Sequence, residues 1–339
     1  MVGLVTSKDG KLTKINKMEL CDNVDTSKVK ILKVLVTPED FDTINGSSDA
    51  TYPIIPGRIA VGQISDASDA AYLTRGTRVY ISPVNNCGTC IECRSDNEVD
   101  CSNFKIAWKN IDGYLRDFAV IENKDMHALP PNVSNAEAIL IDYIAISLST
   151  LEKLEIKKGE HVAIIGGGIL GTVMALVSIY YQAVPILIDN NNENLERARG
   201  AGVYYNYFSD NRLEQEVSER TGAHMAQKVV YISDSNIITD FAIKLSAYNA
   251  KIGFVGFNTP SLKVNFSAAM KKQLSFICIT NGYGMEEQAI NILANKAIDF
   301  SCFKFQSTKF EGCETLIKKV ATEQDENHTR MEPIIVDMM

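Results

Sequence analysis

The sequence has few histidines, a single tryptophan, fewer basic than acidic side chains and no long apolar run. Its 34 Lys and Arg residues are outnumbered by 42 Asp and Glu residues, which gives a net charge of −8. An acidic surface repels phosphate backbones, so we expect no nucleic-acid partner. Charges interrupt every apolar segment before the roughly 18 residues of a membrane helix, so we expect no membrane partner either. Residues 1–9 lack a signal-peptide pattern, which predicts a cytoplasmic protein.

The length and composition are those of a globular protein with two domains. A chain of 339 residues exceeds what one small core accommodates. It is 45% hydrophobic and 22% charged, with 21 Gly and 9 Pro, and these values exclude collagen, coiled coil and extensive disorder.

Four of the eight cysteines lie close together in the sequence. They are Cys87, Cys90, Cys93 and Cys101. In a reducing compartment, thiols clustered at such short spacings indicate a metal site rather than disulfides. Four thiolates complete the tetrahedral coordination of Zn²⁺ and leave no position for a substrate, so we expect one structural zinc ion. A redox-active pair formed by Cys90 and Cys93 is the alternative.

The first third of the sequence has the pattern of short strands. Segments rich in Val and Ile, separated by Gly, Pro and Asn, predict strands at residues 29–36, 54–64, 77–81 and 117–121. Ser134, with Glu137 three residues later, predicts the start of a long helix over residues 136–154.

From His161 onward, strands and helices alternate, which is typical of a parallel sheet with helices on both faces. The predicted strands cover residues 161–165, 184–189, 203–206, 227–232, 251–255 and 274–280. The predicted helices cover residues 169–182, 193–200, 213–221, 237–248 and 285–295. The C-terminal segment is expected to add a strand, a helix over 310–322, a polar turn over 323–328 and an apolar run at 334–336. We expect this segment to return to the first domain.

A glycine-rich loop joins the first strand of this alternating part to the helix that follows. Gly166 permits a tight turn, Gly168 lets backbone N–H groups approach a pyrophosphate, and Gly171 allows the helix to pack closely on the strand. Ile169 and Leu170 complete the motif. Its position between strand and helix predicts a dinucleotide-binding loop, and a glycine turn without a ligand is the alternative.

An acidic residue, Asp189, ends the next predicted strand at about the spacing of NAD-binding folds, roughly 20 residues on. Its carboxylate would accept hydrogen bonds from the ribose hydroxyls and repel a 2′-phosphate. Asn190 and two further asparagines follow, with no arginine among them to bind that phosphate. We therefore expect NAD(H) rather than NADP(H) as the cofactor.

Together these features resemble the zinc-containing medium-chain dehydrogenase/reductase superfamily over nearly the whole chain. The resemblance rests on the cysteine spacing, on the segment 112–118, which is similar to the family's DGGFAEY, and on residues 281–284, which are similar to the sorbitol and threonine dehydrogenase branch. It implies a GroES-like β domain (residues 1–133 and 299–339, with the zinc lobe at 87–101) and a Rossmann domain (residues 134–298). It also implies a homodimer or homotetramer, and places Ser233 beside the nicotinamide half of the cofactor.

The sequence departs from this family where the family holds its catalytic zinc. Thr37 stands in place of a cysteine, and Arg58 in place of a histidine, while Asp142 keeps a carboxylate at the third position. None of the four histidines falls at a ligand position. One carboxylate beside a guanidinium does not hold zinc, so we expect no catalytic zinc.

The resemblance places Arg58 near Asp142 and Asp40. Our hypothesis is that Arg58 takes over the electrostatic role of the metal, pairs with these carboxylates and donates to a substrate oxygen. A salt bridge that fills an idle cavity is the alternative. The groups considered for proton transfer are Glu39, Asp42, Asp142 and Tyr143.

The sequence thus predicts an NAD(H)-dependent oxidoreductase that transfers hydride to or from a hydroxyl or carbonyl carbon of a small molecule. The resemblance implies a polyol, a sugar derivative or an amino alcohol as substrate. Two alternatives remain open: a catalytically silent nucleotide-binding protein that acts as a sensor or scaffold, and a zinc-independent reductase of conjugated C=C bonds.

Overall fold

A computed structural model describes residues 2–16, 24–68, 71–232, 239–256, 263–327 and 333–338. The chain divides into two compact units, and the first contains both ends of the chain. Unit 1 consists of Met1–Asp142 with Phe305–Met339, and unit 2 of Tyr143–Lys304. Both boundaries fall later in the chain than the predicted ones, so Asp142 belongs to the unit that also contains Arg58.

Unit 1 is built on a seven-stranded sheet in the order β16–β17–β3–β4–β5–β9, with β8 also paired to β3. Its strands are β3 (Thr26–Val36), β4 (Ile59–Asp66), β5 (Arg78–Ile81), β8 (Phe118–Glu122), β9 (Met126–Ala128), β16 (Gln306–Lys309) and β17 (Ile334–Asp337). The C-terminal strand β17 pairs antiparallel with β3, so the end of the chain completes a sheet that the beginning started.

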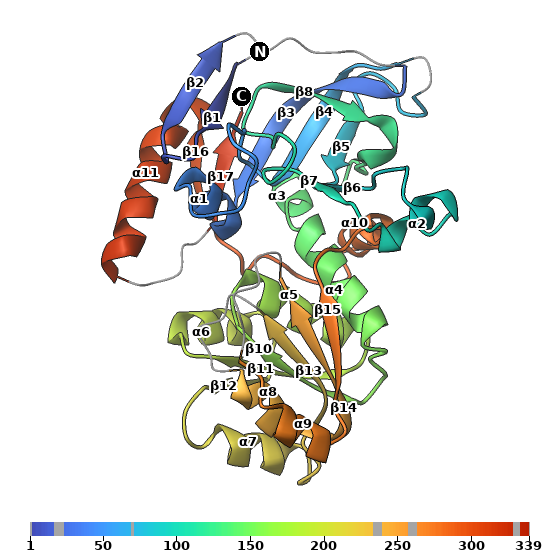
Figure 1. Cartoon of the computed structure of the whole chain (residues 1–339), viewed down its shortest axis with the longest axis vertical. Coiled ribbons are helices and arrows are strands. Elements are labelled where there is room, and N and C mark those ends of the chain that lie inside the picture. Colours follow the sequence, from blue (N-terminus) through green and yellow to red (C-terminus); the bar gives the residue numbers. More distant parts are fainter. Residues whose placement is uncertain are drawn as a thin grey trace. The chain divides into compact units, whose positions relative to one another are not determined.

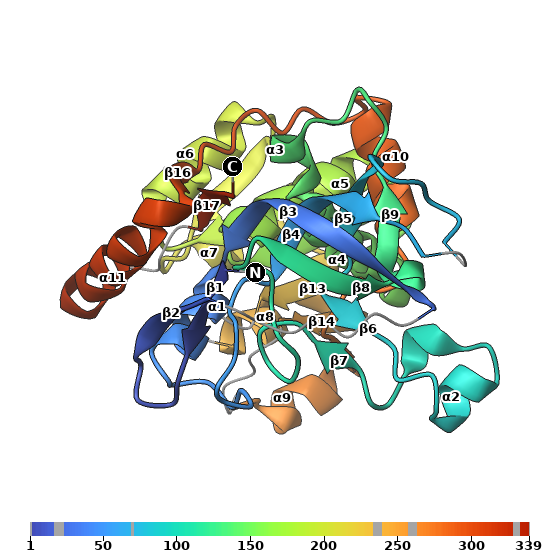
Figure 2. The same ribbon diagram turned by 90° about the horizontal axis from the view of Figure 1, so that it is seen from above.

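Further elements surround this sheet. They are β1 (Val2–Thr6), β2 (Leu12–Asn16), α1 (Pro38–Ile44), β6 (Val84–Asn85), α2 (Ile91–Arg94), β7 (Lys105–Ile106), α3 (Asn135–Ala138) and α11 (Phe310–Asn327). Two 3₁₀ turns, at Glu98–Asp100 and Asn123–Asp125, complete the unit. The lobe around α2 stands apart from strands β3, β4 and β8 (Figure 2).

Unit 2 contains a six-stranded parallel sheet in the order β12–β11–β10–β13–β14–β15. The strands are β10 (His161–Ile165), β11 (Val184–Asp189), β12 (Tyr205–Phe208), β13 (Ala226–Ile232), β14 (Ser246–Val255) and β15 (Ser275–Ile279). Numbered from β10, this is the strand order 3-2-1-4-5-6 of dinucleotide-binding sheets, which reverses between β10 and β13. The predicted doubly wound α/β fold is confirmed (Figure 1).

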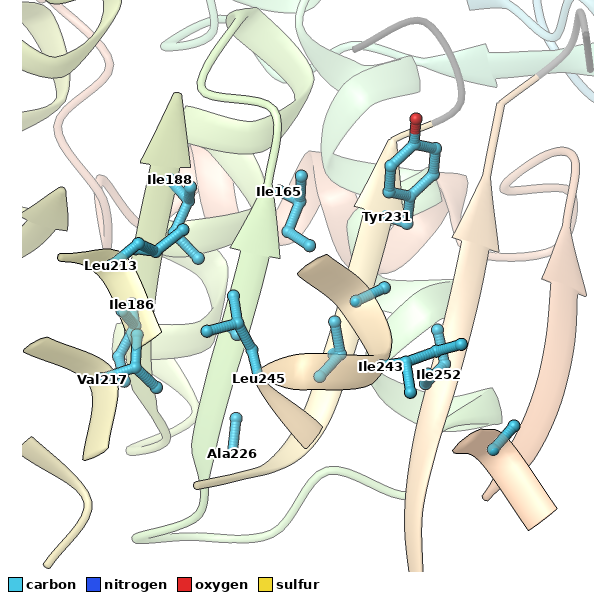
Figure 3. Packing of buried hydrophobic residues seen from close by; sticks show 14 residues of the cluster. Ile165, Ile186, Ile188, Leu213, Val217, Ala226, Tyr231, Ile243, Leu245 and Ile252 are labelled. Atoms are coloured by element: carbon cyan, nitrogen blue, oxygen red, sulfur yellow. The ribbon is translucent and has the colours of Figure 1, made fainter. Parts of the chain in front are cut away.

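The helices of unit 2 alternate with these strands. They are α4 (Ile141–Lys153), which begins at the boundary between the units, α5 (Ile169–Tyr180), α6 (Asn192–Gly200), α7 (Leu213–Arg220), α8 (Asp240–Lys244), α9 (Phe266–Lys271) and α10 (Glu286–Ala294). One face of the sheet packs against α7, α8 and α9, where Leu213 lies beside Ile188, Val217 beside Ile186 and Ile243 beside Ile252 (Figure 3). Because connections between parallel strands are right-handed, α5 and α6 lie on the opposite face. The central strands are therefore apolar on both sides.

Four predicted elements differ most from the structure in their limits. The strand predicted from Ile54 begins only at Ile59, because Gly57 adopts a φ of +100° that interrupts extended backbone. The helix predicted over 136–154 is two helices, α3 and α4, separated by a turn that the Leu140 N–H closes on the Glu137 carbonyl. Ser134 and Glu137 do form the predicted capping box at the start of α3.

The other two differences lie in the second half of the chain. Residues 246–248, predicted as helical, begin β14, because Ser246 pairs with Ala226 of β13. The polar run predicted as a turn is helical as far as Asn327, since Glu and Gln favour helix. No helix of the described residues is both long and apolar enough to cross a bilayer.

Candidate functional site

The glycine-rich loop follows β10 and leads into α5. Gly166 has a φ of +109°, a conformation that glycine adopts without strain. A Cβ atom on Gly171 would lie 1.7 Å from the carbonyl oxygen of Gly166, so this position requires glycine. Gly168 is the N-cap residue of α5 and precedes Ile169 and Leu170, the first residues of that helix. The first N–H groups of a helix have no partners within it, so this end of α5 suits an anionic group.

Asp189 ends β11 beside this loop and is buried. Its carboxylate accepts hydrogen bonds from the Gly167 N–H, from the Asn191 N–H at 2.7 Å and from the Asn194 side-chain amide at 3.2 Å. A Cβ atom on Gly167 would lie 3.0 Å from the Asp189 Cβ, so glycine also allows this close approach. Loop and carboxylate meet at the carboxyl edge of the sheet, next to the point where the strand order reverses, which is where doubly wound folds bind their ligands.

The four clustered cysteines converge in the lobe around α2. The Sγ atoms of Cys87, Cys90, Cys93 and Cys101 all lie within 4.8 Å of one another, and all four residues are free thiols. The Sγ atoms of Cys90 and Cys93 are 3.3 Å apart. Ligands at the usual Zn–S distance of about 2.3 Å in a tetrahedron are about 3.8 Å apart, so this donor set fits zinc.

Backbone donors surround the same sulfurs. The Cys87 N–H points to the Cys101 sulfur and the Cys90 N–H to the Cys87 sulfur, both at 3.3 Å. Hydrogen bonds from Thr89 and Cys90 lower the pKa of Cys87 to about 6. N–H donors stabilise thiolates, which are the form that binds metal. Among the described residues, no other group of three or more Cys, His, Asp or Glu side chains converges in this way.

Arg58 lies at the end of the loop that precedes β4 and forms an ion pair with Asp142 in the first turn of α4. The side chains are only 1% and 5% exposed, respectively. The guanidinium also lies over the indole ring of Trp108, 5.2 Å from its centroid. Trp108 is itself buried and has a φ of +70°. The cation is therefore held between an anion and an aromatic face, an arrangement suited to the planar guanidinium.

Asp40 is wholly buried and ties α1 to the loop that carries Arg58. Its carboxylate accepts hydrogen bonds from the backbone N–H groups of Thr37 (2.8 Å), Gly57 (2.7 Å) and Arg58 (3.3 Å). It also accepts one from the Thr37 hydroxyl at 3.1 Å. Burial raises the pKa of Asp40 to about 6, and the N–H donors act against that rise. We expected Asp40 to pair with the Arg58 guanidinium; the contact between the two residues is the hydrogen bond from the Arg58 backbone N–H.

The remaining predicted site residues are distributed as follows. Thr37 is the N-cap residue of α1, and Glu39 is half-buried in the first turn of the same helix, whereas Asp42 is exposed. Tyr143 is buried in α4 and belongs to unit 2. Asn190 is exposed after β11. Ser233 lies outside the described residues.

Sequence reasoning did not assign three residues to this site: Gly167, Asn194 and Arg197. Gly167, the second glycine of the loop, donates its backbone N–H to Asp189. In α6, Asn194 donates to the same carboxylate, and Arg197 donates to Asn194. No sequence pattern predicts these two hydrogen bonds. Trp108, the single tryptophan, was weighed from the sequence as a residue of the substrate cleft or of the core; it is buried against the Arg58 guanidinium.

The comparisons with known proteins agree with this architecture. Residues 24–131 match the family model of the alcohol dehydrogenase GroES-like domain. An uncharacterized zinc-type alcohol dehydrogenase-like protein of Haemophilus influenzae is 26% identical over 313 residues, which cover 90% of each chain. The sorbitol dehydrogenase of Halalkalibacterium halodurans is 24% identical over 279 residues, which cover 80% of this chain and 81% of the relative.

A solved structure extends the similarity to the whole chain. A short chain alcohol dehydrogenase of Escherichia coli CFT073, crystallised with the cofactor NADH, superposes with a TM-score of 0.87 at 18% identity. The alignment covers 100% of this chain and 99% of that one, so the two share their fold from end to end. The chain therefore contains an alcohol dehydrogenase GroES-like domain and is similar over most of its length to zinc-type alcohol dehydrogenases.

Proposed function

We propose that the protein is an NAD(H)-dependent oxidoreductase that transfers hydride to or from a hydroxyl or carbonyl carbon of a polyol, a sugar derivative or an amino alcohol. The observation that carries this proposal is the contact between the glycine-rich loop and the Asp189 carboxylate at the carboxyl edge of the sheet. The substrate class is supported by the similarity to a sorbitol dehydrogenase.

Asp189 supports NAD(H) over NADP(H). A carboxylate accepts hydrogen bonds from ribose hydroxyls and repels a 2′-phosphate. Its orientation is set by the Gly167 and Asn191 N–H groups before any ligand arrives, so binding requires little rearrangement there. Gly166, Gly168 and the start of α5 would accept the pyrophosphate.

We propose one structural zinc ion, held by Cys87, Cys90, Cys93 and Cys101. All four ligand positions of a tetrahedral ion would be filled by thiolates, so this ion would organise the lobe around α2 and take no part in hydride transfer. Thiolate ligands require a reducing environment, which supports the cytoplasm as the compartment.

The residues at the family's catalytic-zinc positions do not fit a second ion. The Thr37 hydroxyl donates to Asp40, the Asp142 carboxylate is paired with Arg58, and Arg58 itself is a cation. A divalent ion would have to displace a buried guanidinium and break this ion pair. We therefore assign no step of the reaction to a metal.

Arg58 supplies much less electrostatic stabilisation than a metal would. Bound zinc lowers the pKa of water from about 15.7 to about 7, which corresponds to roughly 12 kcal/mol. A hydrogen bond from a charged group contributes about 1.5–3 kcal/mol net. Because only 1% of the Arg58 side chain is exposed, we propose that it fixes the loop and α4, rather than contacting substrate as we had hypothesised.

A residue other than Arg58 must then transfer the proton. The Asp142 carboxylate is held by Arg58, Asp40 is engaged by backbone donors, Asp42 is exposed to bulk water, and Tyr143 is buried in α4. We propose Glu39, half-buried in the first turn of α1, as the group that exchanges a proton with the substrate.

The burial of Arg58 also favours a second candidate function, a catalytically silent protein that binds NAD(H) as a sensor or scaffold. Both functions require the cofactor, and they differ in turnover. The deciding experiment follows NADH formation or depletion against a panel of polyols, amino alcohols and their carbonyl products, with and without a chelator. Turnover that survives chelation and is lost in Glu39→Gln supports the enzyme without catalytic zinc, whereas NADH binding without turnover of any compound supports the silent protein.

We also propose a homodimer or homotetramer. Strand β15 ends the sheet of unit 2, and its segment Ser275–Ile279 carries no charged side chain. An uncharged, exposed edge strand readily pairs with another strand, and a second copy of this chain offers the same edge.

A further inference from the structure

The inference concerns α6, the helix that follows Asp189. Asn194 lies in its first turn and Arg197 one turn further on, so their side chains are neighbours on the helix surface. The Arg197 guanidinium donates through Nη2 to the Asn194 Oδ1, and the Asn194 Nδ2 donates to the Asp189 Oδ2 at 3.2 Å. One amide side chain therefore links a cation to the carboxylate at the proposed ribose site.

The chemistry at both ends fixes the orientation of this amide. A guanidinium has only donors, so Asn194 presents its carbonyl oxygen to Arg197. An ionised carboxylate has only acceptors, so Asn194 presents its NH₂ group to Asp189. A flipped amide would place donor against donor at one end and acceptor against acceptor at the other.

These hydrogen bonds also determine which oxygen of Asp189 can still accept a hydrogen bond from a ligand. Oδ2 accepts two hydrogen bonds, from the Gly167 N–H and from Asn194, while Oδ1 accepts one from the Asn191 N–H. Each carboxylate oxygen offers about two acceptor directions, so the remaining capacity lies on Oδ1. A ribose hydroxyl is thereby directed to Oδ1.

Only the Asn194 side chain therefore separates the Arg197 cation from Asp189, beside which NADP(H) would carry its 2′-phosphate. While Asp189 is present, its carboxylate repels that phosphate, and Arg197 donates to Asn194. Without Asp189, Asn194 would lose its acceptor and the guanidinium could turn to a phosphate, with which it forms strong charge-assisted hydrogen bonds.

We propose that Asn194 and Arg197 are positioning residues that set the choice of dinucleotide: they hold Asp189 for the ribose of NAD(H), and Arg197 becomes the 2′-phosphate ligand when Asp189 is replaced. This inference rests on the proposed dinucleotide site and names the residues that determine its specificity.

The test measures dissociation constants for NADH and NADPH, by nicotinamide fluorescence, in the full-length protein. Asp189→Ser should weaken NADH binding and strengthen NADPH binding, each by about 10-fold, the size expected for a charge-assisted contact. Asp189→Ser combined with Arg197→Gln should lose most of the gain for NADPH and leave the NADH value of the single variant unchanged. A merely structural role of Arg197 would weaken both dinucleotides equally.

Arg199→Gln combined with Asp189→Ser is the matched control. Arg199 lies on the same helix but is exposed and bonds to Glu196 and Asn206, so its loss should leave the gain for NADPH intact. Thermal unfolding verifies that each variant folds. If the Arg197 double variant keeps the NADPH affinity of Asp189→Ser, the inference is overturned while the proposed function stands. If the wild-type protein binds neither dinucleotide, the proposed function fails and this inference with it.

Discussion

The guanidinium of Arg58 and the carboxylate of Asp142 form a buried ion pair between residues that are far apart in the sequence. The Arg58 guanidinium lies over the Trp108 ring, and its backbone N–H donates to Asp40, so this one residue contacts α1, the turn after β7 and Asp142, all within unit 1. Breaking such a pair leaves a charge without a partner in a medium of low dielectric constant, whereas replacing both charges removes that cost.

The first prediction concerns this pair. Arg58→Met should lower the free energy of unfolding by about 3–5 kcal/mol, because it removes the cation that pairs with the buried Asp142 carboxylate. Arg58→Met combined with Asp142→Leu should recover most of the loss. Urea titrations at neutral pH measure both values, with Glu314→Ala, which removes the exposed pair with Lys318, as the control with little effect. A double variant no more stable than the single one would contradict the interpretation.

The second prediction concerns the glycine-rich loop. Gly171→Ala should weaken NADH binding by at least about 10-fold or prevent folding, because its Cβ would collide with the Gly166 carbonyl oxygen. The matched control is Gly200→Ala at the end of α6, where a Cβ would meet no atom within 4 Å. That change should leave binding intact and raise the free energy of unfolding by up to about 0.5–1 kcal/mol. Fluorescence titration with NADH distinguishes the two variants, and equal affinities would refute the assignment of the loop.

The third prediction concerns metal content. Metal analysis of the purified protein should give one zinc ion per chain, bound by the four-cysteine lobe. Cys93→Ser should abolish zinc binding and open residues 87–101 to proteolysis, because a structural zinc site contributes directly to folding. Cys278→Ser, at an exposed cysteine on β15, should change neither. Two zinc ions per chain would show that a metal also occupies the region of Arg58.

The fourth prediction concerns pH. Burial raises the pKa of Asp40 from 3.8 to about 6, so between these values the folded protein binds more protons at this group than the unfolded chain. The contribution of Asp40 to stability is then fully present below about pH 3.8 and falls as the pH rises to about 6, on the order of 3 kcal/mol in all. The measurement is the free energy of unfolding of the wild type minus that of Asp40→Asn, from pH 4 to pH 7. A difference that rises with pH would contradict this sign.

The fifth prediction concerns the edge strand β15. Ile277→Lys places a charge in the middle of an edge that is otherwise uncharged, so it should shift the proposed oligomer toward monomer. Light scattering coupled to size-exclusion chromatography measures the mass. Met270→Lys, on the exposed surface of α9, serves as the control and should leave the mass unchanged. A wild-type protein that is already monomeric would rule out this interface.

Local sequence patterns were sufficient for much of the fold. The strands His161–Ile165 and Val184–Asp189 were predicted to the residue, because buried parallel strands are short apolar runs with clear limits. The prediction of one long helix after Ser134 was wrong, because a turn at Ile139 and Leu140 divides it. Both residues are apolar and buried, as in a helix, and no Gly or Pro marks the turn in the sequence.

The sequence by itself determined the alternation of strands and helices, the glycine-rich loop and the four clustered cysteines. Each depends on neighbours within a few residues, so composition and spacing carry the information. Only the tertiary structure decided that Arg58 pairs with Asp142 through its guanidinium and with Asp40 through its backbone N–H, and that Asn194 joins Arg197 to Asp189. These contacts depend on how elements that are separate in the sequence pack, and on which atom of a side chain faces its neighbour. Only the three-dimensional packing determines these two things.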